Sequence, residues 1–257
     1  MMSKNPFDLS NRVALVTGGN TGIGFGVAEG LIAAGAIVML AARDRAKSQA
    51  AVSALRQAGG TAEAVVADVT DEISRCAMIA STVEAFGRLD ILVNNAGIFL
   101  GGPPEEMELL DWNKVFTTNL TGAFVAAQTA YPHMKRQGGG KIINIASVMS
   151  NFATGHGQAY GASKAALVQL SRSLAVAWAT DNIQVNSVLP GFIDTEMTRR
   201  GREASPELND VVMRRTPAGR WGTPRDLAGV SVFLASDASN FVTGSAITVD
   251  GGWTVRA

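Results

Sequence analysis

The sequence predicts an α/β protein: a doubly wound parallel sheet of seven strands with helices on both faces. Seven short, β-branched apolar runs alternate with longer helical patterns along the 257 residues, which is typical of parallel strands joined by helical crossovers. The runs are continuously apolar, which indicates burial on both faces of the sheet. Neither a Pro/Ser-rich linker nor a repeat divides the chain, so residues 1–257 are expected to form a single domain.

The seven predicted strands each run into a turn or a helical pattern. They are residues 12–17 (RVALVT), 37–42 (IVMLAA), 62–68 (AEAVVAD), 89–95 (LDILVNN), 141–147 (KIINIAS), 182–190 (NIQVNSVLP) and 245–252 (SAITVDGG). Helical patterns such as VAEGLIAAG and DRAKSQAAVSALRQAG connect them, and the crossovers are expected to be right-handed.

One connection departs from this rhythm. Residues 191–222 lie between the sixth and seventh strands and are unusually polar. A connection of that length inside a compact domain is usually functional. We therefore expect a lid-like insertion, with a solvated surface excursion of short helices as the alternative.

Composition excludes several classes of protein. Twenty-two basic residues balance 22 acidic ones, so no charge field is available to recruit nucleic acid or an anionic membrane. The N-terminus lacks a signal-peptide pattern, and no run of about 18 apolar residues occurs. The single cysteine, Cys76, is expected to be a buried small hydrophobe in a reducing compartment. A cytoplasmic protein without a metal is the expectation.

A glycine-rich turn follows the first strand. In TGGNTGIG (17–24) the glycines are Gly18, Gly22 and Gly24, a spacing different from G-x-G-x-x-G. Glycines here let the backbone turn sharply, admit a ligand close to the main chain and begin a helix whose amides face a pyrophosphate. The turn indicates dinucleotide binding in a Rossmann-like fold, although turn geometry alone also explains glycines.

The residues at the end of the second strand indicate which cofactor is preferred. An acid that binds the adenosine ribose normally stands there, but this chain has Ala42 followed by Arg43. An arginine can hold a 2′-phosphate through paired hydrogen bonds. We therefore predict that NADP(H) is preferred and NAD(H) possible. Asp44 either caps the next helix or reaches the ribose.

The third and fourth strands end in further candidate contacts. The carboxylate of Asp68 can accept from the adenine amino group, and Val69 can pack on the ring. Asn95, Ala96 and Gly97, in NNAG, leave room for the ribose. Turn and capping chemistry is the alternative for both segments.

Tyr160 and Lys164, in YGASK, lie one helical turn apart on one helix face. A phenol titrates near pH 10, and a fixed ammonium nearby lowers its pKa. The pair therefore predicts a tyrosine that acts as general acid/base at about pH 7. A buried tyrosine beside a snorkelling lysine is the alternative.

Two other residues support the catalytic interpretation. Ser147 ends the fifth strand, where its hydroxyl can bond a substrate oxygen. Asn119 lies within the helix after the fourth strand, where asparagine is a poor choice unless it bends the helix to hold a water.

With these motifs and NSVLPGFIDT, the chain from about residue 10 onward resembles the short-chain dehydrogenase/reductase family. The resemblance implies that Tyr160 exchanges the proton of a carbonyl or alcohol oxygen, which Ser147 polarises. It implies that Lys164 lowers the pKa of Tyr160 and binds the nicotinamide ribose, and that Asn119 holds a water in a proton relay. It also implies a homotetramer packed through the long helices and the C-terminal strand.

The residues expected to bind the cofactor come from the glycine turn, the strand ends, the catalytic helix and PGFIDT. They are Gly18, Asn20, Thr21, Gly22, Ile23, Gly24, Arg43, Asp68, Val69, Asn95, Ala96, Gly97, Tyr160, Lys164, Pro190, Gly191, Ile193 and Thr195.

The resemblance predicts an NADP(H)-preferring oxidoreductase that interconverts a ketone and a secondary alcohol. Ser147, Tyr160, His156 and Phe192 are the candidate substrate contacts. The C-terminal part resembles sugar-acid and polyol dehydrogenases and also 3-oxoacyl thioester reductases. Val176 stands where carrier-protein reductases commonly have an arginine, which argues modestly against an acidic protein substrate. A dinucleotide-binding sensor without turnover is the alternative of another class.

Overall fold

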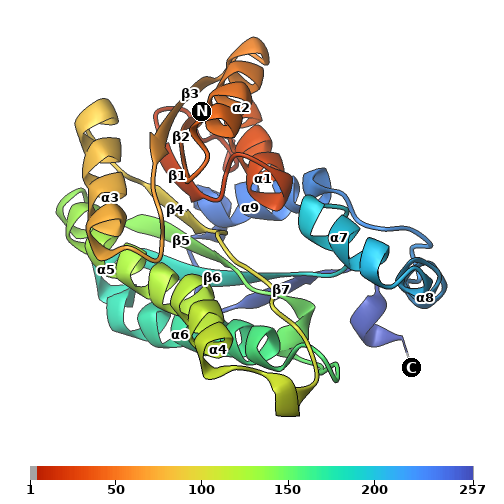
Figure 1. Cartoon of the computed structure of the whole chain (residues 1–257). Helices are drawn as coiled ribbons and strands as arrows, with labels where there is room; N and C mark the ends of the chain where they lie inside the picture. The colour runs from red at the N-terminus through yellow and green to blue at the C-terminus, as the bar shows by residue number, and fades with distance from the viewer. Residues whose placement is uncertain (1–4, 257) are drawn as a thin grey trace.

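The computed structural model describes residues 5–256 and contains one seven-stranded, all-parallel sheet with the order β3-β2-β1-β4-β5-β6-β7 (Figure 1). All seven predicted strands are confirmed. Their bounds are β1 Val13–Thr17, β2 Ile37–Ala42, β3 Thr61–Val66, β4 Ile91–Asn94, β5 Gly140–Ile145, β6 Ile183–Pro190 and β7 Ala246–Val249.

Helices cover both faces of the sheet, as the continuously apolar strands predict. One face carries α1 (Gly22–Ala33), α2 (Arg45–Gln57) and α9 (Ala228–Ala235). The other carries α3 (Glu72–Phe86), α4 (Leu109–Phe116), α5 (Gly122–Arg136) and α6 (Gln158–Trp178). The doubly wound Rossmann-like fold is therefore confirmed.

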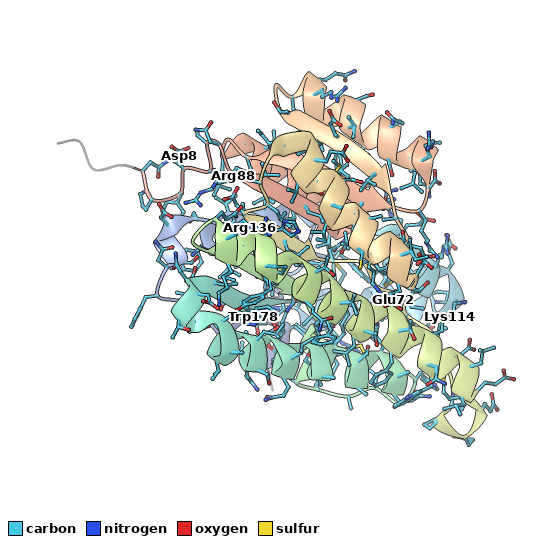
Figure 2. The ribbon with its side chains drawn as sticks, turned by 90° about the vertical axis from the view of Figure 1, so that its left-hand side faces the viewer. Asp8, Glu72, Arg88, Lys114, Arg136 and Trp178 are labelled. Atoms are coloured by element: carbon cyan, nitrogen blue, oxygen red, sulfur yellow. The ribbon has the colours of Figure 1, made fainter. Side chains whose placement is uncertain are left out.

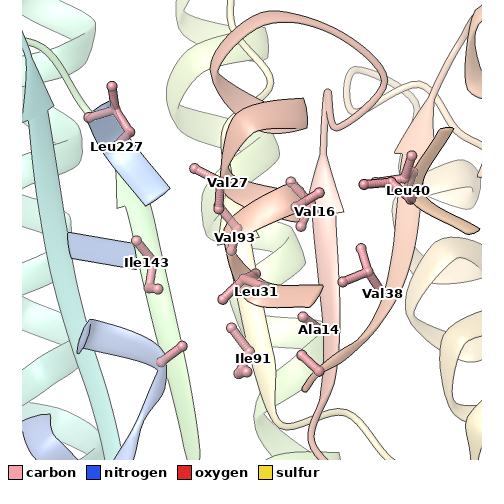
Figure 3. Close-up of a cluster of buried hydrophobic side chains, with 14 of the residues drawn as sticks. Ala14, Val16, Val27, Leu31, Val38, Leu40, Ile91, Val93, Ile143 and Leu227 are labelled. Atoms are coloured by element: carbon pink, nitrogen blue, oxygen red, sulfur yellow. The ribbon is translucent and has the colours of Figure 1, made fainter. Parts of the chain in front are cut away.

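The core on the α1 face packs one helix into the centre of the sheet. Val27 and Leu31 of α1 are fully buried against Val16 and Ile91 of the neighbouring strands β1 and β4 (Figure 3). Burying side chains of this size contributes roughly 1.5–3 kcal/mol each. This packing fixes α1 against the central strands of the sheet.

The order of strands reverses between β1 and β4. The chain moves outward from β1 to β2 and β3, then returns to pair β4 with the other side of β1. The connections on the two sides therefore leave toward opposite faces, and a crevice opens at the carboxyl ends of these strands. In Figure 2, Glu72 at the start of α3 and Lys114 of α4 lie at one end of the molecule. Arg88, just after α3, and Arg136, at the end of α5, lie at the other end.

Residues 191–222 form an excursion with two short helices, α7 (Glu196–Ala204) and α8 (Glu207–Arg215), which lie to one side of the sheet in Figure 1. The two ends of the excursion meet. Ile193 forms a β-bridge with Gly222, and the Asp194 amide donates to the Gly222 carbonyl at 2.8 Å. The short helices expected here are present, and their shared base holds them beside the carboxyl edge.

Cys76 corrects one expectation from the sequence, because this residue is exposed rather than buried. The buried face of α3 is formed by Arg75, Met78, Ile79 and Thr82. Cys76 falls outside that face and approaches Thr129 Oγ1 at 3.8 Å. Within residues 5–256, no helix has both the length and the hydropathy needed to cross a membrane.

Candidate active site

Two adjoining cavities follow the carboxyl edge of the sheet. The larger has a volume of about 990 Å³ and the smaller about 240 Å³. Residues of the glycine turn, the β4 end and α7 line both of them: Gly18, Thr21, Ala96, Gly97 and Glu196. The two cavities therefore form one elongated cleft at the crevice where the strand order reverses.

The glycine turn has the backbone that its sequence predicts. Gly18 and Gly22 have φ angles of 61° and 54°, a region that side chains other than glycine rarely adopt. Gly24 has a different reason. A Cβ atom there would overlap the Gly18 carbonyl and lie 2.5 Å from Asn95 Nδ2. Gly24 lines neither cavity, so its glycine serves the packing of the turn.

The α1 N-terminus faces the smaller cavity. Gly22 and Ile23, the first residues of α1, line this cavity. Thr21, the N-cap, makes no side-chain hydrogen bond to the first-turn amides. The first amides of a helix have no partner within the helix, and they favour an anion such as a phosphate.

Arg43 and Asp44 are adjacent at the end of β2, but their side chains make different contacts. Asp44 Oδ1 accepts from the Lys47 amide at 3.0 Å and caps α2, so the structure shows the capping alternative. Arg43 lines the larger cavity, with 73% of its side chain exposed. Its nearest carboxylate oxygen is Asp68 Oδ2, at 4.0 Å. The guanidinium therefore keeps donors available for an anionic ligand.

Asp68 and Asn95 each form hydrogen bonds with the local backbone, and each also lines a cavity of the cleft. Asp68 Oδ1 accepts from the amide and hydroxyl of Thr70 at 2.8 and 2.7 Å. Burial opposes the shift, but these bonds and the Arg43 charge hold the pKa of Asp68 below its usual value. Asn95 Nδ2 donates to the carbonyls of Thr17 and Gly18 at 2.9 and 3.0 Å. Both segments therefore form the turn hydrogen bonds that were the alternative interpretation, and both also lie beside a cavity where a ligand could contact them.

Ser147, Tyr160 and Lys164 meet in the smaller cavity. Ser147 follows β5 and is the N-cap of the short turn Val148–Ser150, where its Oγ accepts from the Met149 amide at 3.1 Å. Tyr160 and Lys164 project from the first two turns of α6. The strand end and the helix start thus bring together three groups separated by up to 17 positions.

Lys164 is buried, with 3% of its surface exposed. Its Nζ donates to the Ile145 carbonyl at 2.7 Å and lies 5.7 Å from the centre of the Tyr160 ring. Burial lowers the pKa of Lys164 to about 8, because an apolar environment disfavours the charged form. The amine is therefore fixed beside the tyrosine and the fifth strand.

The pKa of Tyr160 corrects a second expectation. The sequence predicts a value below the usual one, but the protein groups alone raise the pKa of this phenol. Burial is the cause, and the hydrogen bond with Ser147 opposes it only in part. Lys164 is directed to the Ile145 carbonyl, so its charge does not reverse the effect of burial.

Asn119 lies in a π-helical segment, Thr117–Thr121, between α4 and α5. The Gly122 amide bonds to the Thr117 carbonyl, five residues back, which widens the helix. Asn119 Oδ1 accepts from the Ile98 amide at 2.8 Å, and Nδ2 donates to the Ile98 carbonyl and Ser163 Oγ at 3.0 and 3.1 Å. The predicted irregularity of this helix is confirmed, and the amide lies behind the cavity rather than in its lining.

The other predicted site residues divide into two groups. Apart from Gly24, Asn119, His156 and Phe192, every predicted site residue lines one of the two cavities. His156 is exposed, and its carbonyl accepts from the Gly102 amide. Phe192 packs in an aromatic cluster, with ring centres 5.7 Å from Trp221 and 4.5 Å from Trp253. Substrate contact by these two side chains stays a prediction.

Glu196 is a cleft residue that the sequence did not reveal. It lines both cavities and pairs with Lys47 of α2 at 3.3 Å and Arg200 at 2.6 Å. The Lys47 pair joins α2, beside the larger cavity, to α7. Its residues lie 149 positions apart, so a local pattern could not have predicted it.

Comparisons with known proteins match this chain to reductases and dehydrogenases. A protein-family model described as enoyl-(acyl carrier protein) reductase matches residues 18–254. The gluconate 5-dehydrogenase of Gluconobacter oxydans (strain 621H) is 41% identical, over 97% of this chain and 97% of that protein. The 2,5-dichloro-2,5-cyclohexadiene-1,4-diol dehydrogenase of Sphingobium indicum is 36% identical, over 96% and 98%.

A solved structure also matches almost the whole length of this chain. The crystal structure of a gluconate 5-dehydrogenase from Burkholderia cenocepacia J2315, in complex with NADP and tartrate, superposes with a TM-score of 0.93. It is 39% identical, and the match covers 98% of each chain.

Proposed function

Because the chain belongs to the short-chain dehydrogenase/reductase family, we propose that it is an NADP(H)-preferring oxidoreductase that interconverts a ketone and a secondary alcohol. One observation carries the proposal. Ser147, Tyr160 and Lys164 line the same cavity as the glycine turn and the start of α1. A phenol, a hydroxyl and an amine beside a phosphate-binding turn are the groups that such a reaction requires.

The cleft fits a dinucleotide on structural grounds. A Cβ atom at Gly22 would lie 3.3 Å from Thr195 Cγ2, so glycine keeps open the passage between the turn and α7. At the larger cavity, Arg43 and Lys47 supply positive charge. At the smaller cavity, Pro190 and Ile193 supply apolar lining. When bound, the nicotinamide cofactor supplies or accepts the hydride.

Ser147 and Tyr160 act on the substrate oxygen. The Ser147 hydroxyl donates to this oxygen and stabilises the charge that develops on it. Tyr160 gives its proton to that oxygen in reduction and takes it back in oxidation. The raised pKa of Tyr160 in the protein alone suits the acid role, since the phenol stays protonated at neutral pH.

Lys164 and Asn119 act behind Tyr160. The fixed ammonium of Lys164 stabilises the phenolate that forms when Tyr160 has lost its proton. Gly97 brings both groups close to the cleft: a Cβ atom there would lie 3.2 Å from Asn119 Oδ1 and 3.3 Å from Lys164 Nζ. When the Lys164 ammonium passes a proton to the phenolate, a water held by Asn119 can replace that proton on the amine.

The named relatives act on chemically different alcohols, a sugar acid and a chlorinated cyclic diol. Their names therefore support the reaction more firmly than the substrate. The test is a turnover assay with both cofactors over sugar acids, polyols, 3-oxoacyl thioesters and cyclic ketones and alcohols. Binding of NADPH without turnover of any of these compounds would favour the sensor alternative.

Cofactor preference gives the first prediction. Arg43→Ala is expected to weaken NADPH binding about tenfold, because charge-assisted hydrogen bonds to the 2′-phosphate are lost. NADH binding should stay nearly unchanged, since NADH lacks that phosphate. Arg45→Ala is the matched control: it removes a neighbouring arginine that lines neither cavity of the cleft. Dissociation constants measured by calorimetry check the result, and equal affinities of the starting protein for both cofactors would contradict the preference.

Assembly and location complete the proposal. We propose a cytoplasmic homotetramer packed through α5, α6 and β7. Exposed apolar side chains on two of these elements support it, with Phe124 of α5 39% exposed and Val176 of α6 84% exposed. The single cysteine supports a reducing compartment. Static light scattering should give four times the chain mass, and the mass of one chain would contradict the tetramer.

Residues 191–222 are proposed to act as a lid of a single dinucleotide-binding and catalytic domain. Two positions support this role: Glu196 and Met197, at the start of α7, line the smaller cavity. Hydrogen exchange of the native protein should slow in α7 and α8 when NADPH is added. Unchanged exchange would make the segment a surface excursion.

A further inference from the structure

An ion pair joins two elements that line the cleft. Lys47 Nζ of α2 donates to Glu196 Oε2 of α7 at 3.3 Å. Both residues line the larger cavity, and Glu196 also lines the smaller one. Within residues 5–256, this is the one ion pair that joins α7 or α8 to an element outside residues 191–222. It therefore ties the excursion to the part of the cleft that α2 forms.

A further cavity, of about 340 Å³, lies beside the same pair. Lys47 and Glu196 line it together with residues of α1, α2 and the glycine turn, among them Thr21 and Ala50. Thr21 and Ala50 are exposed, so this cavity is at the molecular surface. Because the two charged residues line both this cavity and the larger cavity of the cleft, the pair stands between the cleft and the surface.

The start of α7 lies close to the glycine turn, where the two cavities of the cleft meet. A Cβ atom at Gly22 would lie 3.3 Å from Cγ2 of Thr195, the N-cap of α7. Glu196, the next residue, lines both cavities. A dinucleotide has a wide nucleoside at each end and a narrow pyrophosphate between them, so it cannot be threaded lengthwise past this junction. Its entry and exit therefore require the start of α7 to move away from the turn.

The contacts within the start of α7 do not oppose such a movement. Thr195 and Thr198 form a capping box. The Asp194 carboxylate pairs with Arg199 at 2.9 Å and also with Arg202. All of these contacts join residues of the excursion to one another, so they stay intact when α7 moves as a unit. The ion pair with α2, in contrast, has to break.

Glu196 keeps a cationic partner when the pair with Lys47 opens. Arg200 Nη2 lies 2.6 Å from Glu196 Oε1, one turn along the same helix. The hydrogen bond and charge of Lys47, followed by those of Arg200, hold the pKa of Glu196 below its usual value, so the carboxylate is ionised at neutral pH. The side chains of Lys47 and Glu196 are about half exposed, at 54% and 51%. Water can therefore solvate both groups, and opening has a low cost.

We propose that the Lys47–Glu196 pair is a latch that holds the start of α7 over the cleft, and that its opening controls entry and release of the dinucleotide. This inference rests on the proposed function and names what holds the proposed lid closed. Because the two residues pair with each other rather than with the ligand, loss of the pair lowers the barrier in both directions. Association and dissociation should both become faster, with little change in Kd.

The test measures NADPH association and dissociation by stopped-flow fluorescence in the native protein, in Glu196→Gln, in Lys47→Met and in the double variant. We expect both rate constants to rise about threefold in each single variant, the scale of one half-exposed ion pair. The double variant should show no further rise, since both substitutions break the same pair.

A direct effect of the two charges on the ligand gives a different result. Lys47 attracts the phosphates and Glu196 repels them, so the two single variants would then change the association rate in opposite directions. Any outcome in which association is not faster in both single variants overturns the latch, while NADPH binding leaves the proposed function intact. Failure of the native protein to bind NADPH would instead remove the proposed function as well.

Glu29→Gln is the matched control. Glu29 of α1 pairs with Arg225 at the same distance, 3.3 Å, and the two residues lie 196 positions apart. Neither residue lines the cleft. The loss of this pair should leave both rate constants unchanged. An equal rise in Glu29→Gln and Glu196→Gln would show a general loosening of the chain and would also overturn the latch.

Discussion

Replacement of Tyr160 by phenylalanine is expected to lower kcat by about 10²–10⁴-fold, the usual contribution of a general acid/base. The variant keeps the ring that packs against Phe99 and loses only the hydroxyl. Ser147 can still polarise the substrate oxygen, but no group is left to exchange its proton. The dissociation constant for NADPH should be nearly unchanged, because the turn, Arg43 and Lys164 remain. Single-turnover kinetics and cofactor titration of the same preparation check both parts.

The chain supplies its own control, since Tyr131 is its other tyrosine. Tyr131 donates to Asp181 Oδ2 at 2.7 Å, on α5 and away from the cleft. Tyr131→Phe should cost about 1 kcal/mol of unfolding free energy and leave kcat unchanged. Full turnover of Tyr160→Phe would remove the phenol from its proposed role.

Replacement of Lys164 by methionine is expected to lower kcat by about 10²-fold or more. Methionine fills a similar volume, but it carries no charge to stabilise the phenolate of Tyr160. It also cannot donate to the Ile145 carbonyl, which Lys164 binds at 2.7 Å. The loss of turnover should persist at saturating NADPH, and a normal kcat under those conditions would contradict the role of the amine.

The same variant should alter how stability depends on pH. The pKa of Lys164 is about 8 in the folded chain and 10.5 in the reference state. Below pH 8 the amine is charged in both states, so the burial cost is present in full. Between pH 8 and 10.5 the unfolded chain binds more protons than the folded one, so the unfolding free energy rises with pH. Above this window the cost is absent.

Wild type should therefore gain unfolding free energy relative to Lys164→Met as pH rises through this window, by on the order of 3 kcal/mol in total. Urea denaturation at pH 7 and 10 measures the difference. Lys141→Met is the matched control, because burial lowers the pKa of Lys141 to about 8 as well. Lys141 binds Ser239 and Asn240 outside the cleft. Its variant should show the same pH trend with kcat intact, and a difference that is constant with pH would contradict the burial argument.

The local patterns of the sequence were sufficient for the architecture. Strand positions, the glycine turn and the Tyr160–Lys164 spacing depend on neighbours within a few residues, where periodicity and backbone sterics act directly. The irregular helix at Asn119 was predicted for the same reason, because asparagine is a poor helix former, and the structure widens the helix there. Arg43 and Ala42 could be assigned to a strand end from the β2 pattern alone.

The sequence by itself thus determined the fold and the family, and it predicted candidate catalytic groups that the structure brings together in one cavity. Only the tertiary structure decided that Phe99 packs against Tyr160 and that Glu196 pairs with Lys47. It also decided that burial raises the Tyr160 pKa, where the sequence predicted that Lys164 would lower it. Each of these depends on contacts between distant parts of the chain and on how much water they exclude. Desolvation is set by the whole packed interior, and no short stretch of residues specifies it.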